Sequence, residues 1–156
     1  MSDEATIDDW RPVLVRFCST YLRGAASAED VAQEVCIQAA ALDAWPTRTW
    51  LFTAARHRCL NLLRGERRRP DNRRLATGTD LAASAIGPLT RMVKLEDAAQ
   101  VEELLVRLSD AQREVLLLRY AQGLGREEIA AVVGETTAVV KSRLYEGLNR
   151  LRELAR

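Results

Sequence analysis

The sequence predicts an all-α protein of two small helical domains joined by a flexible linker, and three observations lead to this fold class. Apolar residues recur at three-to-four spacing over most of the chain. Glycines and capping residues divide these periodic stretches into helices of ordinary length. Residues 70–88 are rich in Asn, Gly, Thr, Ser and Ala and have little apolar periodicity, which is typical of a linker. We therefore expect domains over residues 1–69 and 92–156, with a linker over residues 70–91.

The first domain should contain three helices. Apolar spacing predicts the first over residues 7–22. Ser27 can cap a second helix over residues 28–42, and Thr47, which follows a helix-breaking Trp-Pro pair, can cap a third over residues 48–64. On the second helix, the residues that point away from the apolar face include Asp30, Gln33 and Glu34.

The second domain should begin with a helix over residues 92–108. Ser109, followed three residues later by Gln112, is a capping-box signature and predicts a helix that Gly123 ends. A short helix over residues 126–133 should then end at Gly134. Thr136 can cap a last helix that continues nearly to the end of the sequence.

A short helix, a glycine turn and a longer helix form the helix-turn-helix pattern, whose second helix enters the DNA major groove. The apolar face of the last helix should be formed by Val140, Leu144, Leu148 and Leu151. Its other sides carry polar and charged groups that suit base edges and phosphates. An ordinary amphipathic bundle helix with a solvated face is the alternative that this pattern leaves open. The polar and charged residues concerned are Lys141, Ser142, Arg143, Tyr145, Glu146, Asn149, Arg150 and Arg152.

Charge is distributed unevenly along the 156 residues, although the net charge is only +1. Residues 1–47 contain eight acidic residues and three arginines, whereas residues 48–74 contain nine arginines and two acidic residues. The apolar fraction of 47% is ample for two small cores. A basic segment beside an acidic one favours two different partners.

The sequence gives no support for a membrane segment, a metal or a catalytic site. It lacks both a basic start followed by an apolar run and a stretch of about 18 apolar residues, so we expect a cytoplasmic chain without membrane insertion. Cys18, Cys36 and Cys59 lack CxxC spacing and are expected to be buried, reduced thiols. His57 and Cys59 would project about 200° apart on one helix, which disfavours a zinc site or a catalytic pair. We expect no metal, no cofactor and no enzymatic activity.

Three blocks carry a resemblance to a known family. Leu108 to Leu154, including Gln112-Arg113-Glu114-Val115 and Val140-Lys141-Ser142-Arg143-Leu144, resembles region 4 of sigma-70-family initiation factors of the extracytoplasmic-function (ECF) group. LuxR-type output domains share this general pattern, so a second block is needed. "SAEDVAQEV" resembles region 2.2, and "RTWLFTAARHRCLNLLRGERRR" resembles regions 2.3 and 2.4.

The resemblance implies a region 2 helical bundle and a region 4 helix-turn-helix, with bacterial core RNA polymerase and promoter DNA as partners. Asp30, Gln33 and Glu34 would meet the polymerase clamp helices, region 4 would also bind the polymerase flap, and an anti-sigma factor is expected. Residues implied for the melted −10 strand are Trp50, Arg56, Arg58, Asn61, Arg64, Arg67, Arg68 and Arg69. Those implied for the −35 element are Lys141, Ser142, Arg143, Tyr145, Glu146, Asn149 and Arg150.

Some positions depart from the family pattern. The loop from Asp43 to Arg48 is several residues shorter than usual, and in the family this loop helps to form a pocket for a flipped −10 base. Gly125 replaces a Ser or Thr cap, and Gly147 inside the last helix costs about 1 kcal/mol relative to alanine. Glu146 would be repelled by phosphates unless it accepts from a cytosine amino group, which predicts an unusual −35 sequence. A sigma mimic that binds an anti-sigma factor without touching DNA is the alternative function, and the clustered arginines argue against it.

Overall fold

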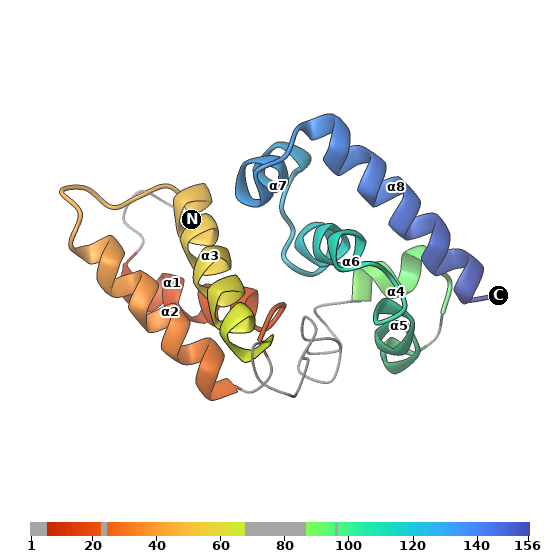
Figure 1. Ribbon diagram of the computed structural model, residues 1–156, viewed down its shortest axis with the longest axis horizontal. Helices are drawn as coiled ribbons and strands as arrows, with labels where there is room; N and C mark the ends of the chain where they lie inside the picture. The colour runs from red at the N-terminus through yellow and green to blue at the C-terminus, as the bar shows by residue number, and fades with distance from the viewer. Residues whose placement is uncertain (1–5, 23–24, 68–86, 96) are drawn as a thin grey trace. The chain divides into compact units, whose positions relative to one another are not determined.

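The computed structural model describes residues 6–22, 25–67, 87–95 and 97–156 (Figure 1). Every regular element in these ranges is a helix, which confirms the all-α fold class. By its internal contacts the chain divides into two compact units, Met1–Ala76 and Thr77–Arg156. Each unit has a core of its own.

Three helices form the first unit: α1 (Ile7–Cys18), α2 (Ala25–Ala40) and α3 (Arg48–Arg67). All three pack against one another. α1 ends earlier than predicted, because residues 19–21 form a turn, and α2 begins three residues earlier than predicted. The predicted cap of α3 is confirmed, since the backbone N–H of Trp50 donates to Thr47 Oγ1 at 3.1 Å.

Aromatic rings fill the core of the first unit. Phe17 of α1 stacks on Phe52 of α3 with ring centroids 4.6 Å apart, and Trp10 meets the same ring edge-on at 6.0 Å. All three side chains are buried. Such pairs contribute about 0.5–1.5 kcal/mol each beyond the area that they bury. The cluster therefore fixes α3 against α1 and leaves the outer side of α3 to polar residues.

The three cysteines are buried free thiols, as predicted. A hydrogen bond with Cys18, together with burial, raises the pKa of the Cys59 thiol, and burial raises the pKa of Cys36. A thiol that stays protonated is a poor nucleophile and a poor metal ligand. His57 is exposed whereas Cys59 is fully buried, so these two side chains do not share a site.

The second unit contains α4 (Gly87–Met92), α5 (Ala98–Leu105), α6 (Asp110–Leu116), a π-helical turn (Leu117–Ala121), α7 (Arg126–Val133) and α8 (Thr137–Leu154). α6 and α7 both pack on α8, and Figure 1 shows the short connection from α7 into α8. The core is mostly aliphatic, with leucines from the helices and the π-helical turn fully or almost fully buried.

The single helix predicted over residues 92–108 is wrong, because the structure breaks it after residue 92. Asp97 caps the new helix, and its carboxylate accepts from the backbone two residues further on at 3.0 Å. Lys94, inside the break, has a left-handed φ of 57°. Val93 and Val101 are both buried, so the apolar spacing continues through the break and hides it.

Helix α4 also falls within the range 70–91 that was expected to be linker. Gly87 begins this helix, and Leu89 is fully buried. Residues 87–91 of the expected linker are therefore part of the packed second unit, because Leu89 is buried in its core. Residues 70–86 lie outside the residues that the structure describes.

The predicted helix ends of the helix-turn-helix are confirmed. Ser109 and Thr136 each accept a backbone N–H through the side-chain hydroxyl, at 3.2 Å in both cases. Gly134 ends α7 with a left-handed φ of 73°. At the start of α7, the N–H of Gly125 donates to the Glu128 carboxylate at 3.3 Å. This bond satisfies one orphan donor of the kind that a helix start leaves.

Gly147 lies where α8 crosses α6. A Cβ atom added there would stand 3.2 Å from Leu116 Cδ1 and 3.3 Å from the Cβ of Gln112. The absence of a side chain thus lets the two helices approach closely, which offsets the low helix propensity of glycine. Leu148 is only half-buried. The rest of the predicted apolar face is buried, namely Val140, Leu144 and Leu151.

The connection from α6 to α7 is held by its own residues. Leu117–Ala121 winds as a π-helical turn, a form that differs from a regular helix by one extra residue. Gly123 then takes a left-handed φ of 74°, as predicted for this helix end. Arg119 Nη1 donates to the carbonyl oxygen of Leu124 at 3.0 Å and so ties the turn together.

Candidate nucleic-acid interface

The outward face of α2 carries the three polar residues that were predicted to bind a protein partner. Asp30, Gln33 and Glu34 are all exposed, because the opposite side of the helix contributes valines to the core. Sequence reasoning missed Ile37, which is 61% exposed. Its spacing of three from Glu34 is the signal that places it on the same face. The α2 face, defined as these four residues, thus combines carboxylates and an amide with one apolar side chain.

The cations of α3 are presented to different degrees. Arg58, Asn61 and Arg64 are exposed and follow one another at a spacing of three. Arg56 and Trp50 are half-buried, so they offer less surface to a ligand. The remaining predicted residues of this group lie outside the described part of the structure, as the side chain of Arg67 and the whole of Arg68 and Arg69.

An ion pair joins α2 to α3. Arg58 Nε donates to Glu34 Oε2 at 2.8 Å, and Arg58 Nη2 donates to Glu34 Oε1 at 3.4 Å. Each side chain is 48% exposed. The structure therefore brings together two residues that the sequence assigned to different partners, one to protein and one to DNA.

The loop between α2 and α3 carries a buried donor. Trp45 is half-buried, and its indole Nε1–H is buried without a hydrogen-bond partner. A buried polar group left unpaired costs about 1–3 kcal/mol.

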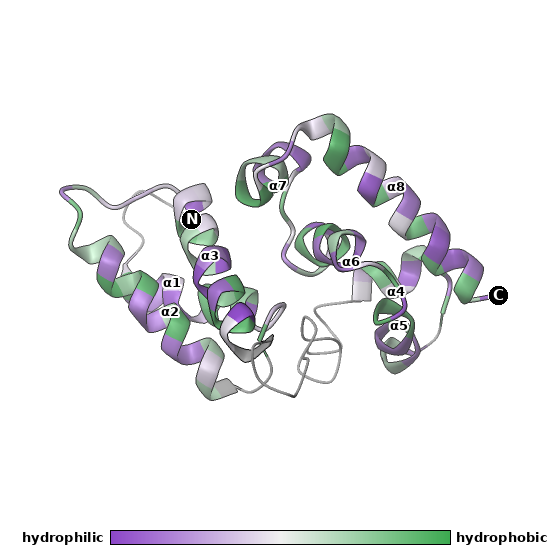
Figure 2. Cartoon of the chain, in the orientation of Figure 1, coloured by the Kyte–Doolittle hydropathy of each residue, from purple (hydrophilic) through white to green (hydrophobic). Residues whose placement is uncertain are grey.

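The outward side of α8 is rich in hydrogen-bonding groups, and Figure 2 shows hydrophilic and hydrophobic residues alternating along this helix. Tyr145 is 70% exposed. Arg143 and Asn149 are half-buried. The remaining predicted residues of this face are exposed, namely Lys141, Ser142, Glu146 and Arg150.

Two arginines of α8 are paired with nearby carboxylates. Arg143 Nη2 lies 3.3 Å from Glu135 Oε1, just before the helix begins. Arg150 Nη1 lies 3.4 Å from Glu153 Oε2, one turn further along. Pairs in contact with solvent are weak, about 0–1 kcal/mol, so a phosphate can replace either carboxylate at small cost.

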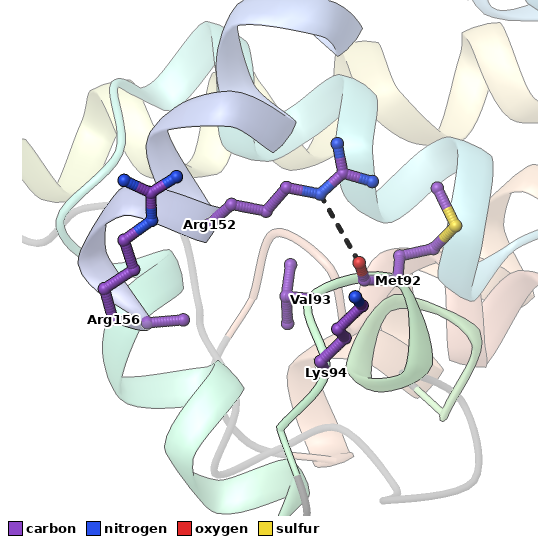
Figure 3. A pocket seen from close by; sticks show the side chains of 6 residues that line it. Met92, Val93, Lys94, Arg152 and Arg156 are labelled. Atoms are coloured by element: carbon purple, nitrogen blue, oxygen red, sulfur yellow. Dashed lines mark hydrogen bonds between the residues drawn. The ribbon is translucent and has the colours of Figure 1, made fainter.

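The basic end of α8 has a structural role. Arg152, grouped by sequence with the flanking cations, donates from Nε to the carbonyl oxygen of Met92 at 3.4 Å (Figure 3). Lys94 and Arg156 line the same pocket, which has a volume of about 530 Å³. Two helices end here, and cations are favourable beside helix C-termini. The Arg152 bond thus joins α4 to α8.

Part of the most diagnostic sequence block is also structural. Arg113 is fully buried, with Nη2 bonded to Asp110 Oδ1 at 2.6 Å and Nη1 to the carbonyl oxygen of Leu105 at 3.5 Å. The guanidinium thereby links the end of α5 to the first turn of α6. Arg113 therefore stabilises the fold of the second unit and is not accessible to DNA.

Within the described ranges, no group of three or more His, Cys, Asp or Glu residues is arranged to hold a metal ion. No helix in that same part of the chain is both long and apolar enough to cross a membrane. The candidate binding sites are therefore exposed surfaces, namely the α2 face, the cations of α3 and the polar side of α8.

Two protein families match the chain. The family described as Sigma-70 region 2 matches residues 6–69, which hold α1, α2 and α3. The family described as Sigma-70, region 4 matches residues 98–151, from the start of α5 to near the end of α8. Together the two matches cover well over half of the sequence.

Several curated proteins are similar to this chain over most of its length. The ECF RNA polymerase sigma factor SigD of Mycobacterium tuberculosis is 34% identical over 163 residues, covering 92% of this chain and 72% of SigD. The ECF RNA polymerase sigma factor ShbA of Streptomyces griseus is 32% identical, covering 92% of this chain and 82% of ShbA.

A solved structure is similar to this chain in fold. The sigma factor RpoE from Bartonella quintana, in complex with the anti-sigma factor NepR, matches with a TM-score of 0.68 at 26% sequence identity. The match covers 94% of each chain.

Proposed function

Because this chain belongs to the sigma-70 family, in its ECF group, we propose that it binds bacterial core RNA polymerase, recognises the −35 and −10 elements of promoters and promotes melting of the DNA. The observation that carries this proposal is the pairing of surfaces in the first unit. A face with carboxylates and an amide on α2 contacts Arg58, one of the exposed arginines on α3. No bond is made or broken by the chain itself, whose residues position the polymerase.

The first unit would bind both polymerase and single-stranded DNA. Asp30, Gln33 and Glu34 suit a basic protein surface such as the polymerase clamp helices, and complementary charge favours rapid and specific docking. Arg58 and Arg64, continued by the sequence run that ends at Arg69, would neutralise phosphates of the displaced −10 strand.

Melting would then be a matter of binding equilibrium. Contacts that exist only with the unpaired strand stabilise the open state and shift the population toward it. Each base held on such a surface contributes about 1–3 kcal/mol. Asn61, exposed between the arginines, would make one of these base contacts.

The second unit would read duplex DNA. In a helix-turn-helix the second helix lies in the major groove with its N-terminal residues on base edges, which here are Lys141, Ser142 and Tyr145 of α8. The same unit would bind the polymerase flap. We propose that residues 70–91 connect the two units, with α4 at the end of the connection belonging to the second.

An anti-sigma factor is the third proposed partner, because the similar RpoE structure contains one. Such an inhibitor would cover the α2 face and so exclude the polymerase. The alternative function, a sigma mimic that binds an anti-sigma factor without touching DNA, gains support from the same complex. The exposed arginines of α3 favour the sigma factor, since a mimic has no use for cations aimed at phosphates.

In vitro transcription tests the proposal. The purified chain is mixed with bacterial core polymerase and genomic DNA, and transcript starts are mapped. We expect start sites that share upstream sequences and disappear when Asp30, Gln33 and Glu34 are all changed to alanine. The matched control changes Glu29, a neighbouring exposed acid of α2, to alanine and should leave the starts in place. Absence of any start site, together with tight binding of an anti-sigma factor, would establish the mimic instead.

A further inference from the structure

The ion pair between Glu34 of α2 and Arg58 of α3 connects the two surfaces to which the proposed function assigns different partners. Both oxygens of the carboxylate accept from the guanidinium, through Nε at 2.8 Å and Nη2 at 3.4 Å. Such a two-bond arrangement orients the planar group as well as neutralising it. In the free chain, Arg58 thus directs two of its donors at Glu34.

We infer that this ion pair couples polymerase binding to DNA binding. The inference rests on the proposed function and deepens it. A DNA phosphate that approaches Arg58 must compete with the Glu34 carboxylate for the same donors and is repelled by its charge. A cation of the polymerase that approaches Glu34 repels Arg58 and weakens the pair. Binding of polymerase at Glu34 therefore releases Arg58 toward the DNA strand, and in the free chain the pair makes DNA binding through Arg58 modestly weaker.

The size of the coupling follows from the exposure of the pair. Each side chain is 48% exposed, and pairs in such solvent contact are worth little. The coupling should therefore change binding constants by at most about fivefold. Linkage requires that the effect be reciprocal, so DNA on Arg58 raises the affinity of Glu34 for polymerase by the same factor.

A double-mutant cycle on the full chain without polymerase tests the first half of the inference. The variants are Glu34→Gln, Arg58→Gln and the combination, and the probe is a fluorescent single-stranded oligonucleotide of mixed sequence at low salt. Glu29→Gln removes the same charge from the same helix and measures the general effect of charge. We expect Glu34→Gln to raise DNA affinity several-fold more than Glu29→Gln does, and to lose this excess when Arg58→Gln is also present.

Core polymerase in the absence of DNA tests the second half. Arg58→Gln should tighten binding of the chain to polymerase by up to about fivefold, because Glu34 no longer has a competing partner. The gain should vanish in the Glu34→Gln background.

Two results would overturn the inference: equal effects of Glu34→Gln and Glu29→Gln on the DNA probe, or an effect of Glu34→Gln that persists without Arg58. Either would leave the proposed function intact, since that depends on start sites mapped with the polymerase. Failure of transcription with wild-type chain would instead contradict the proposed function itself.

Discussion

The two long helices α3 and α8 both present candidate DNA-binding residues, but they do so in different ways. α3 exposes arginines at regular spacing beside one asparagine, whereas α8 exposes a lysine, a serine, a tyrosine and a glutamate within residues 141–146. The first surface suits a charged strand of any sequence, and the second suits distinct donors and acceptors on base edges. Their glycines differ as well, since Gly65 of α3 has open space around it and Gly147 of α8 lies against α6. Glycine is thus not needed for packing at position 65 of α3, whereas at position 147 it permits the close packing of α8 on α6.

The largest effect should follow from adding a side chain at Gly147. In Gly147→Leu, a side chain would begin within 3.2 Å of Leu116, and overpacking of this kind should lower the free energy of unfolding of the second unit by about 3 kcal/mol. Urea unfolding of the full chain can localise the loss. The three tryptophans, Trp10, Trp45 and Trp50, all lie in the first unit.

The far-ultraviolet circular dichroism of Gly147→Leu should therefore show part of the helix unfolding at lower urea. Its tryptophan fluorescence should report the wild-type transition. A fluorescence shift of equal size would show that the two units unfold together, and an unchanged dichroism curve would contradict the close packing of α8 on α6.

A change at Glu146 should separate base reading from charge on α8. Glu146→Gln removes a carboxylate that would accept from a cytosine amino group, so discrimination at one base pair should fall by about 1–3 kcal/mol. Overall affinity for duplex DNA should rise, because a repulsive charge is removed. Binding of the polymerase complex to a library of −35 variants measures both effects, and an unchanged sequence preference would exclude Glu146 from base contact.

The matched change on α3 should alter affinity for DNA without altering sequence preference. Arg64→Ala should weaken binding to single-stranded DNA by a similar factor for every sequence, since a phosphate contact carries no base information. The slope of log affinity against log salt should become shallower by about 0.7 for each phosphate that the variant no longer neutralises. Titrations of the polymerase complex at several salt concentrations give this slope, and a sequence-dependent weakening would assign Arg64 to a base instead.

The smallest effect should come from Gly65. An alanine there meets nothing within 4 Å and relieves the entropic cost of a helical glycine. Gly65→Ala should therefore stabilise the first unit by about 0.5–1 kcal/mol. Tryptophan fluorescence during urea unfolding should move to higher urea, and a decrease in stability would contradict the open space around this position.

Local signals allowed much of the fold to be predicted, and their absence explains the errors. α7 begins and ends at the predicted residues, because Gly134 and the cap before Arg126 act within a few positions of the chain. The break before α5 was missed, since Asp97 caps a helix inside a stretch whose apolar spacing is uninterrupted. Helix propensity carries no information about such a break when both flanking segments share one core.

The candidate sites could be predicted only in part, for a related reason. Periodicity places Asp30 and Arg58 on exposed faces, which the structure confirms. The bond between Arg58 and Glu34 depends on how α2 and α3 pack against each other. The spacing of residues along a single helix gives no information about that packing. Burial of Arg113 is similar, because its partner carbonyl lies eight residues away in another helix.

The π-helical turn at Leu117–Ala121 has a consequence for tolerance to length changes. The turn holds one residue more than a regular helical turn, and this extra residue affects where the chain leaves the helix toward α7. Deleting any one of its five residues would return the turn to regular helical geometry, so the chain would reach Gly123 one residue earlier and the connection into α7 would have to change. A single-codon deletion there should thus weaken the proposed binding of duplex DNA more than most single substitutions on α8 do.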